Sequence, residues 1–302
     1  MDIKAQVINK LKTQKPKKEG KINVWNLHDP KILYITEKQT KGYTKLDKLH
    51  VYSKGMHDAE TDLILQNLNK FIKFMQDDLN IIDLGCGEAL KTIEIIKVAK
   101  KQGKRIFFYP VDTSKHLLRI AIRNAEKEGI KTIGFQKDFT NLKNIISKVR
   151  KNIQNFIYFG ANLSNFDRNK ILSLLRNNMG KKDVLYVSVQ LRKEIRKIIE
   201  QYKAEEHGWF LFETLKFVGF RKADLVYTAR FNNKTKEIEA VYIIKKVPKE
   251  LKDLNLRKND KIIISTSFKP KLNQFKKIIR RHFKAMFLLN KEGTYTGAIC
   301  RI

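Results

Sequence analysis

The stretch IIDLGCGEALKT, which begins at Ile81, places two glycines one residue apart directly after an apolar run typical of a buried strand. Glycine tolerates backbone angles that a Cβ atom would forbid, and it lets a ligand lie directly against the main chain. Asp83 adds a carboxylate at the end of the same expected strand. Gly85, Cys86 and Gly87 are therefore a candidate ligand-binding loop, with a plain tight turn as the alternative.

Two further acidic residues follow the next two expected strands. Asp112 ends the run RIFFYPVD, where a carboxylate can accept hydrogen bonds from both hydroxyl groups of a ribose. Asp138 and Phe139 follow the third strand, where a side-chain oxygen can accept from the exocyclic amine of adenine and a ring can line the base pocket. Each aspartate could instead cap a helix. Together, the glycine loop and the two acids at successive strand ends predict a nucleoside-binding site.

The same loop could serve a nicotinamide or flavin dinucleotide, which binds through a Gly-x-Gly-x-x-Gly pattern. Here the third position is Leu90, so the pyrophosphate-binding pattern is incomplete. The fourth expected strand ends in FGANLSNF, in which Gly160 opens a loop and Asn162 and Asn165 supply neutral polar groups. We expect the acceptor of a transferred group to lie there, with an ordinary asparagine-rich turn as the alternative.

The elements that must hold these residues alternate between short apolar strands and amphipathic helices. The expected strands are 80–84, 105–111, 133–136, 156–160 and 183–191. The expected helices are 59–75, 90–102, 117–128 and 168–177. This alternation predicts a mostly parallel α/β sheet covered by helices on both faces, with ligands bound at the carboxyl ends of its strands.

After residue 191 the pattern changes to helices mixed with antiparallel strands. Its expected elements are a helical region at 194–217 and strands at 225–231, 237–245 and 262–268. The chain then ends with a helix at 272–283 and a hairpin of strands 284–289 and 295–302. A last helix that leads into an antiparallel hairpin on a parallel sheet resembles the end of the Rossmann-like class I S-adenosylmethionine-dependent methyltransferases.

The composition gives further bounds. The chain has 302 residues, 42% of them hydrophobic, which suffices for one large domain or two closely associated ones. Its 63 Lys and Arg against 31 Asp and Glu give a net charge of +32, which favours nucleic acid or an acidic surface as a partner. Because the lysines are spread along the chain, a biased composition is the alternative explanation.

Other classes of protein are disfavoured by what the composition lacks. No apolar run is long enough to span a membrane, and the amino-terminal segment lacks an apolar signal core. Only two cysteines, Cys86 and Cys300, are present, and the six histidines show no metal-ligand spacing. We therefore expect a cytoplasmic protein without a bound metal or a disulfide framework.

Short motifs through nearly the whole chain resemble the histidine α-N-methyltransferases of the ergothioneine pathway. On the amino-terminal side these motifs are DPKILY with Tyr34, and HVYSKGMHDAE with Tyr52 and Glu60. In the sheet region they are GEALKT with Lys91, VDTS with Asp112, KDF with Asp138 and Phe139, and FGANLSNF with Gly160 and Asn165. Tyr202 lies where the family has a tyrosine that faces the acceptor.

The resemblance implies an S-adenosylmethionine-dependent N-methyltransferase that acts on a small-molecule amine. The residues expected to bind the donor are Asp83, Gly85, Cys86, Gly87, Lys91, Asp112, Asp138, Phe139 and Gly160. The residues expected at the acceptor are Tyr34, Tyr52, Gly160, Asn165, Tyr202, Ser265 and Ser267. Of these, we expect Asn165, Tyr52 and Tyr202 to orient the amine for attack.

The resemblance also implies a division of the chain into three parts. The expected parts are a basic amino-terminal arm at 1–19, an acceptor-covering α+β domain at 20–58 plus 192–267, and a donor-binding Rossmann-like domain at 59–191 plus 268–302. The second domain would explain why residues 192–267 interrupt the alternation of strands and helices.

One segment departs from the family pattern. The family carries a Glu two residues before a Ser in the strand that returns to the sheet, and this pair holds the imidazole of histidine. Here the segment is ISTSFK, with Ser265 at the Glu position and Ser267 at the Ser position. We therefore expect the acceptor to be the amine of an amino acid or a related small molecule, with histidine as one candidate.

Two alternatives remain open at the level of the sequence. An RNA or protein methyltransferase would use the same donor site and would hold its acceptor on the basic surface. A non-catalytic module would bind the nucleoside or a partner without chemistry. The intact glycine loop and both acids favour an enzyme over such a module.

Overall fold

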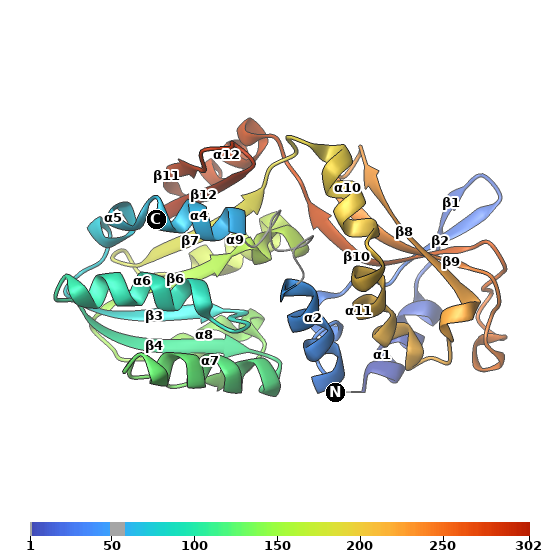
Figure 1. Cartoon of the computed structure of the whole chain (residues 1–302), viewed down its shortest axis with the longest axis horizontal. Coiled ribbons are helices and arrows are strands. Elements are labelled where there is room, and N and C mark those ends of the chain that lie inside the picture. Colours follow the sequence, from blue (N-terminus) through green and yellow to red (C-terminus); the bar gives the residue numbers. More distant parts are fainter. Residues whose placement is uncertain (1, 49–57) are drawn as a thin grey trace. The chain divides into compact units, whose positions relative to one another are not determined.

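The computed structural model describes residues 2–48 and 58–302 of the chain. The chain divides into two compact units, each of which is described by itself (Figure 1). Unit 1 comprises Met1–Gly55 and Glu194–Phe268, and unit 2 comprises Met56–Lys193 and Lys269–Ile302. Residues far apart in the sequence therefore combine in each unit, since the Glu194–Phe268 segment interrupts unit 2.

Unit 2 contains a seven-stranded sheet with the order β11-β12-β7-β6-β3-β4-β5. The strands are β3 (Asp78–Leu84), β4 (Arg105–Asp112), β5 (Phe135–Gln136), β6 (Gln154–Gly160), β7 (Val184–Gln190), β11 (Lys284–Leu289) and β12 (Tyr295–Arg301). β3 to β7 are parallel, whereas β12 is antiparallel to both of its neighbours, β7 and β11. This topology confirms the predicted Rossmann-like class I methyltransferase sheet.

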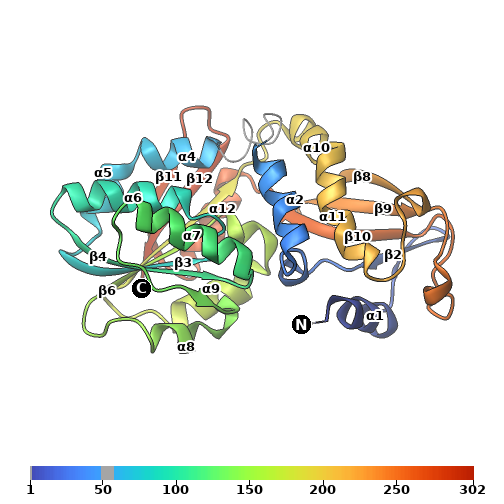
Figure 2. The same ribbon diagram turned by 60° about the horizontal axis from the view of Figure 1, so that its bottom comes forward.

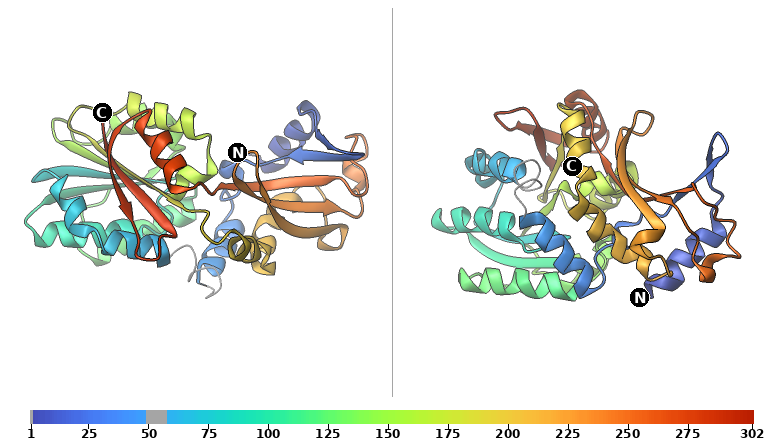
Figure 3. Two further views of the ribbon diagram at one scale, coloured as in Figure 1. Left: turned by 90° about the horizontal axis from the view of Figure 1, so that it is seen from above. Right: turned by 45° about the vertical axis from the view of Figure 1, so that its right-hand side comes forward.

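Two layers of helices cover this sheet. Layer A comprises α4 (Asp58–Leu65), α5 (Leu68–Lys73), α6 (Leu90–Lys101) and α7 (Lys115–Lys127). Layer B comprises α8 (Leu142–Ile146), α9 (Arg168–Asn177) and α12 (Leu272–Arg280). Each layer buries its apolar side chains in a separate core, which places the layers on opposite faces of the sheet (Figures 2 and 3).

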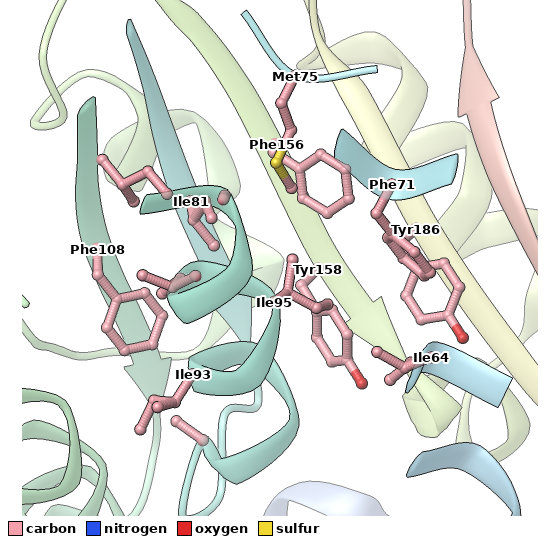
Figure 4. Packing of buried hydrophobic residues seen from close by; sticks show 14 of the residues in the cluster. Ile64, Phe71, Met75, Ile81, Ile93, Ile95, Phe108, Phe156, Tyr158 and Tyr186 are labelled. Atoms are coloured by element: carbon pink, nitrogen blue, oxygen red, sulfur yellow. The ribbon is translucent and has the colours of Figure 1, made fainter. Parts of the chain in front are cut away.

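The strands of unit 2 are apolar along their whole length because both of their faces are covered. In β7 every residue from Val184 to Gln190 is buried. On the layer A side, Ile93 and Ile95 of α6 pack in the same core as Ile81 and Phe108 (Figure 4). The sheet therefore forms a rigid support whose strand ends can hold polar side chains in fixed positions.

Unit 1 is an α+β unit around a five-stranded sheet with the order β1-β2-β10-β9-β8. The strands are β1 (Lys17–Glu19), β2 (Ile22–Asn26), β8 (Leu225–Asn232), β9 (Glu237–Ile244) and β10 (Lys261–Phe268). The helices are α1 (Ile3–Thr13), α2 (Glu37–Lys48), α10 (Ile195–Lys203) and α11 (Glu205–Lys216). Short 3-10 turns lie at Pro30–Ile32, Lys222–Asp224 and Lys249–Leu251.

Some expectations about local structure were wrong. The residues expected to form a separate basic arm belong to unit 1, because α1 buries Ile3, Val7 and Leu11 in its core and β1 pairs with β2. The helix expected at 59–75 is divided at Asn67, whose side-chain amide donates to the carbonyl oxygen of Leu63 at 2.8 Å. None of the helices that the structure describes is both long and apolar enough to cross a membrane.

Candidate active site

The glycine loop after β3 presents bare main chain at the carboxyl end of the parallel strands. The N–H groups of Gly85 and Cys86 both donate to the carbonyl oxygen of Val111 in β4, at 2.8 and 3.1 Å. Gly87 has φ +56°, and a Cβ atom built on it would find no atom within 4 Å. The loop is thus fixed to β4, while its second glycine leaves space for a ligand.

Asp112 is the last residue of β4 and contacts this loop. Its carboxylate is buried and accepts from the N–H groups of Gly87 at 3.1 Å and Ser114 at 2.8 Å. Burial raises the pKa of Asp112, while the hydrogen bonds from Ser114 and Gly87 oppose that rise by stabilising the ionised form. Each carboxylate oxygen is therefore fixed by one N–H group and retains capacity to accept from a ribose hydroxyl.

Asp138 and Phe139 lie after β5, at the start of a 3-10 turn, Phe139–Asn141. Asp138 caps this turn, because one carboxylate oxygen accepts from the N–H group of Thr140 at 2.8 Å. The Phe139 ring packs edge-on against Phe159 and Phe166, with centroids 5.3 and 5.1 Å apart. This places an acceptor beside an aromatic wall, which suits an adenine ring.

Asp83 and Cys86 lie inside the protein. Asp83 is 2% exposed and accepts from the Thr92 hydroxyl of α6 at 2.6 Å. Burial raises the pKa of Asp83 to about 7, although the bond from Thr92 opposes this rise. Burial also raises the pKa of the Cys86 thiol, which opposes formation of a thiolate nucleophile. Asp83 thus connects the end of β3 to the first turn of α6.

Glu60 is a buried carboxylate that was not among the predicted site residues. It is 2% exposed, and it pairs with Lys91 of α6 at 2.5 Å. The Tyr158 hydroxyl of β6 donates to it at 3.5 Å, and the Ser188 hydroxyl of β7 also donates to it. Glu60 therefore connects α4, α6 and the ends of two strands in one polar cluster.

Gly160 ends β6 next to this cluster. It has φ +50°, and a Cβ atom there would lie 2.9 Å from the Tyr158 ring and 3.1 Å from a Glu60 oxygen. Neither the backbone angle nor the space permits a larger side chain without displacement of these groups. The hydroxyl groups of Tyr158 and Tyr186 point in the same direction from their strands (Figure 4). Gly160 therefore allows β6 to approach the Glu60 cluster closely.

The loop after Gly160 is tied to the glycine loop. It forms a 3-10 turn, Ala161–Asn165, in which Asn162 donates its side-chain amide to the carbonyl oxygen of Leu84 at 2.8 Å. A Cβ atom on Gly85 would lie only 2.8 Å from the same amide nitrogen. Asn162 is thus a structural link between two strand ends, whereas Asn165 ends the turn and stays the predicted acceptor-orienting residue of unit 2.

The other predicted acceptor residues lie in unit 1, except Tyr52, which falls outside the described residues. Tyr34 packs with Tyr43 and Phe210, at centroid distances of 5.2 and 5.4 Å. Tyr202 lies in the last turn of α10, and its ring packs edge-on against His207 with centroids 4.9 Å apart. Their roles at an acceptor stay predictions.

Ser265 and Ser267 lie in β10, where their side chains share one face because a strand alternates with period two. A bulge in the pairing with β9 falls between Ile263 and Ser265, immediately before them. The eight residues of β10 include no acidic side chain. The strand therefore offers hydroxyl groups where the family pattern has a carboxylate.

A family model for histidine-specific, S-adenosylmethionine-dependent methyltransferases matches residues 29–289 of the chain. The chain belongs to this family. Its members share the class of methyl donor, so this protein is an S-adenosylmethionine-dependent methyltransferase. The predicted resemblance is thereby confirmed.

Individual relatives of this methyltransferase are distant. Ergothioneine biosynthesis protein 1 of Schizosaccharomyces pombe is 24% identical over 158 residues, which are 49% of this chain and 20% of that protein. The chain thus spans only about a fifth of that relative.

The solved structures to which this chain is similar are also distant. A S-adenosylmethionine-dependent methyltransferase from Clostridium acetobutylicum shares 12% identity at a TM-score of 0.48, over 88% of this chain and 99% of that one. The PH0226 protein from Pyrococcus horikoshii shares 9% identity at a TM-score of 0.49, with the same coverage of both chains.

The residues present in unit 2 of this methyltransferase fit the donor. The open surface at Gly87 admits a ligand, and the fixed Asp112 oxygens suit the two hydroxyl groups of its ribose. Among residues 2–48 and 58–302, no group of three or more His, Cys, Asp or Glu side chains could hold a metal ion. The assignment of the glycine loop, the two acids and the aromatic wall to the donor stays a prediction.

Proposed function

We propose that this protein transfers a methyl group from S-adenosylmethionine to the amine of an amino acid or a related small molecule. The observation that carries the donor assignment is the Asp112 carboxylate, which two backbone N–H groups fix beside the open main chain of Gly87. In a class I sheet, this position at the end of the second strand is where a nucleoside ribose is held.

The donor would be held by a small set of side chains in unit 2. Asp112 accepts from the ribose, Asp138 accepts from the adenine amine, and Phe139 covers the adenine ring. Lys91 provides a cation for the carboxylate of the methionine part, and its pairing with Glu60 fixes its position. When bound, the donor supplies an electrophilic sulfonium methyl group, so the protein needs no strong nucleophile of its own.

The protein must then bind the amine as a free base, with its nitrogen in line with the bond between the methyl group and the sulfur. Asn165 supplies a neutral amide that can accept from an amine without protonating it. Within unit 2 we also assign Gly160 to the acceptor; for unit 1 the family resemblance predicts Tyr34 and Tyr202. No general base is required, because the amine loses its proton to solvent before it attacks.

The sequence of β10 bears on the identity of the acceptor. A carboxylate can accept strongly from both the ammonium and imidazole groups of a substrate, whereas a serine hydroxyl forms a weaker, neutral hydrogen bond. Ser265 and Ser267 therefore favour an acceptor whose side chain carries no imidazolium. The proposal accordingly extends to amino acids other than histidine and to related amines.

The proposal is tested by production of S-adenosylhomocysteine with each of the common amino acids in turn, histidine included. We expect turnover with one acceptor or a small group of them, and its loss in Asp112→Ala. Turnover only with RNA or with a protein would support the alternative acceptor class. Donor binding in calorimetry without turnover on any acceptor would instead support a non-catalytic module.

A further inference from the structure

The two helical layers of unit 2 differ in their charge. The segments 139–182 and 269–291 contain α8, α9, α12 and β11, and their one acidic residue, Asp167, caps α9 by accepting from the N–H group of Lys170. We use the name basic face for nine of the exposed cations in these segments. They are Lys143, Lys148, Lys170, Arg176, Lys271, Lys277, Arg280, Arg281 and Lys284.

The segment that contains layer A is closer to balance, since residues 58–138 hold 14 Lys and Arg against 12 Asp and Glu. Lys97 of α6 pairs with Glu94 at 3.2 Å, and around the start of β4 Lys104 pairs with Asp77 at 2.9 Å. The cations of the basic face form no ion pair with any residue at 2–48 or 58–302, as is also true of Lys101, Arg123 and Lys127 in layer A. A biased composition would affect both layers alike, so it does not explain why acidic residues balance the cations around layer A and are almost absent around layer B.

The cations of different elements come close to one another. The ring of His282, directly after α12, lies 3.4 Å from the side-chain oxygen of Asn169 in α9. Burial lowers the pKa of His282, and the positive charges of Arg176 and Arg281 lower it further. Lys276 and Arg280 also flank the Phe287 ring, at 5.6 and 5.3 Å from its centroid. Layer B therefore gathers positive charge on one rigid surface.

We propose that the basic face binds the phosphate backbone of a double-stranded nucleic acid. Unpaired cations on fixed helices attract a regular array of phosphates, and the release of counterions drives such binding. Exposed asparagines lie among these cations, at Asn144, Asn169, Asn177 and Asn273, and amide groups commonly donate to phosphate and sugar oxygens. The partner is thus recognised by its backbone and not by its base sequence.

The apolar side chains of layer B disfavour two other polyanions. Binding to a bilayer commonly uses an apolar helix face, yet the apolar residues of α12, such as Phe275 and Ile279, are buried against the sheet. Of the large hydrophobic side chains in residues 139–182 and 269–291, only Met286 and Leu289 of β11 are exposed, and neither carries a ring on which unpaired bases could stack. A duplex, which presents phosphates and keeps its bases stacked, matches this surface best.

The test measures binding of a fluorescent duplex of about 20 base pairs, as RNA and as DNA, over a range of salt concentrations. The variant Arg176→Glu/Lys277→Glu/Arg281→Glu removes three cations of the basic face. Its matched control, Lys101→Glu/Arg123→Glu/Lys127→Glu, makes the same change in net charge at exposed positions of α6 and α7. Both variants are first shown to be folded by circular dichroism and by binding of S-adenosylhomocysteine.

We expect the wild type and the control to bind the duplex with similar affinity. The basic-face variant should bind at least about 50-fold more weakly near 0.1 M salt, with a salt slope smaller by about 3. Equal losses in both variants would overturn the proposal, because binding would then follow total charge. Binding to anionic vesicles or to polyglutamate without binding to a duplex would overturn it as well.

Discussion

Two regions at the carboxyl edge of the unit 2 sheet hold their carboxylates in different ways. At the ends of β4 and β5, Asp112 and Asp138 accept mainly from backbone N–H groups of nearby loops. At the ends of β6 and β7, Glu60 accepts from the side chains of Tyr158, Ser188 and Lys91. Main-chain N–H groups hold the carboxylates of the first region. The second region consists of side chains from α4, α6, β6 and β7.

The difference teaches how each region can be used. Backbone N–H groups fix a carboxylate while its remaining lone pairs stay available, which suits a site that must bind a ligand. A carboxylate that already accepts from a lysine, a tyrosine and a serine has few lone pairs left to accept further hydrogen bonds, which suits a structural support. We therefore assign ligand binding to Asp112 and positioning of Lys91 to Glu60.

The largest effect is expected from the support region. Glu60→Ala should lower the free energy of unfolding by about 3–5 kcal/mol, because it leaves a partly buried Lys91 without its partner. The control is Glu94→Ala, which breaks the more exposed pair with Lys97 and should cost below about 1 kcal/mol. Urea denaturation of both variants checks this, and equal losses would contradict the assignment of Glu60.

A double variant sharpens the same point. If the cost of Glu60→Ala comes from the unpaired charge, Glu60→Leu/Lys91→Met should recover most of the lost stability, since buried pairs are replaceable by apolar groups of similar size. Recovery below about half would show that the Tyr158 and Ser188 contacts carry the stability instead. The comparison uses the same denaturation measurement.

The next effect is expected at the ribose acceptor. Asp112→Ala should weaken binding of S-adenosylhomocysteine by about 100-fold, because two charge-assisted hydrogen bonds are lost. Its effect on stability should be about 1–2 kcal/mol, smaller than that of Glu60→Ala. An unchanged affinity in calorimetry would reject the ribose assignment and remove the contrast between the two regions.

A smaller effect is expected from Asp83, whose pKa burial raises to about 7. The folded state holds this proton more tightly than the unfolded chain, so the stabilisation is present at low pH and is lost as pH rises through about 7. The stability of the wild type relative to Asp83→Asn should therefore fall by about 2 kcal/mol between about pH 5.5 and pH 8. Thermal unfolding at several pH values measures this, and a constant difference would contradict it.

The two regions also differ in how well the sequence predicted them. Asp112 was predicted as a site residue because it directly follows an apolar strand and lies beside a glycine loop, both local patterns. Glu60 stood in a motif that resembles the family, but no local pattern linked it to Tyr158 or Ser188. Those contacts depend on how α4 packs over the sheet, which the sequence of α4 alone does not fix.

The same distinction applies to the fold. The strands of unit 2 were predicted because a strand buried on both faces is a continuous apolar run. β1 and α2 of unit 1 were not predicted, since the three residues of β1 are all exposed and α2 is rich in lysine. Pairing with a neighbouring strand stabilises β1, and packing against α11 stabilises α2, so neither element is marked by its own composition.

The central claim is that the main chain at Gly87 and the Asp112 carboxylate form the donor site. Calorimetry with S-adenosylhomocysteine on Gly87→Ala and Gly103→Ala tests it most directly. Both glycines have positive φ, +56° and +81°, and open space at the Cβ position, but Gly103 lies at the opposite end of α6. We predict that Gly87→Ala weakens binding by about 100-fold while Gly103→Ala binds like the wild type. Equal affinities in the two variants would contradict the claim.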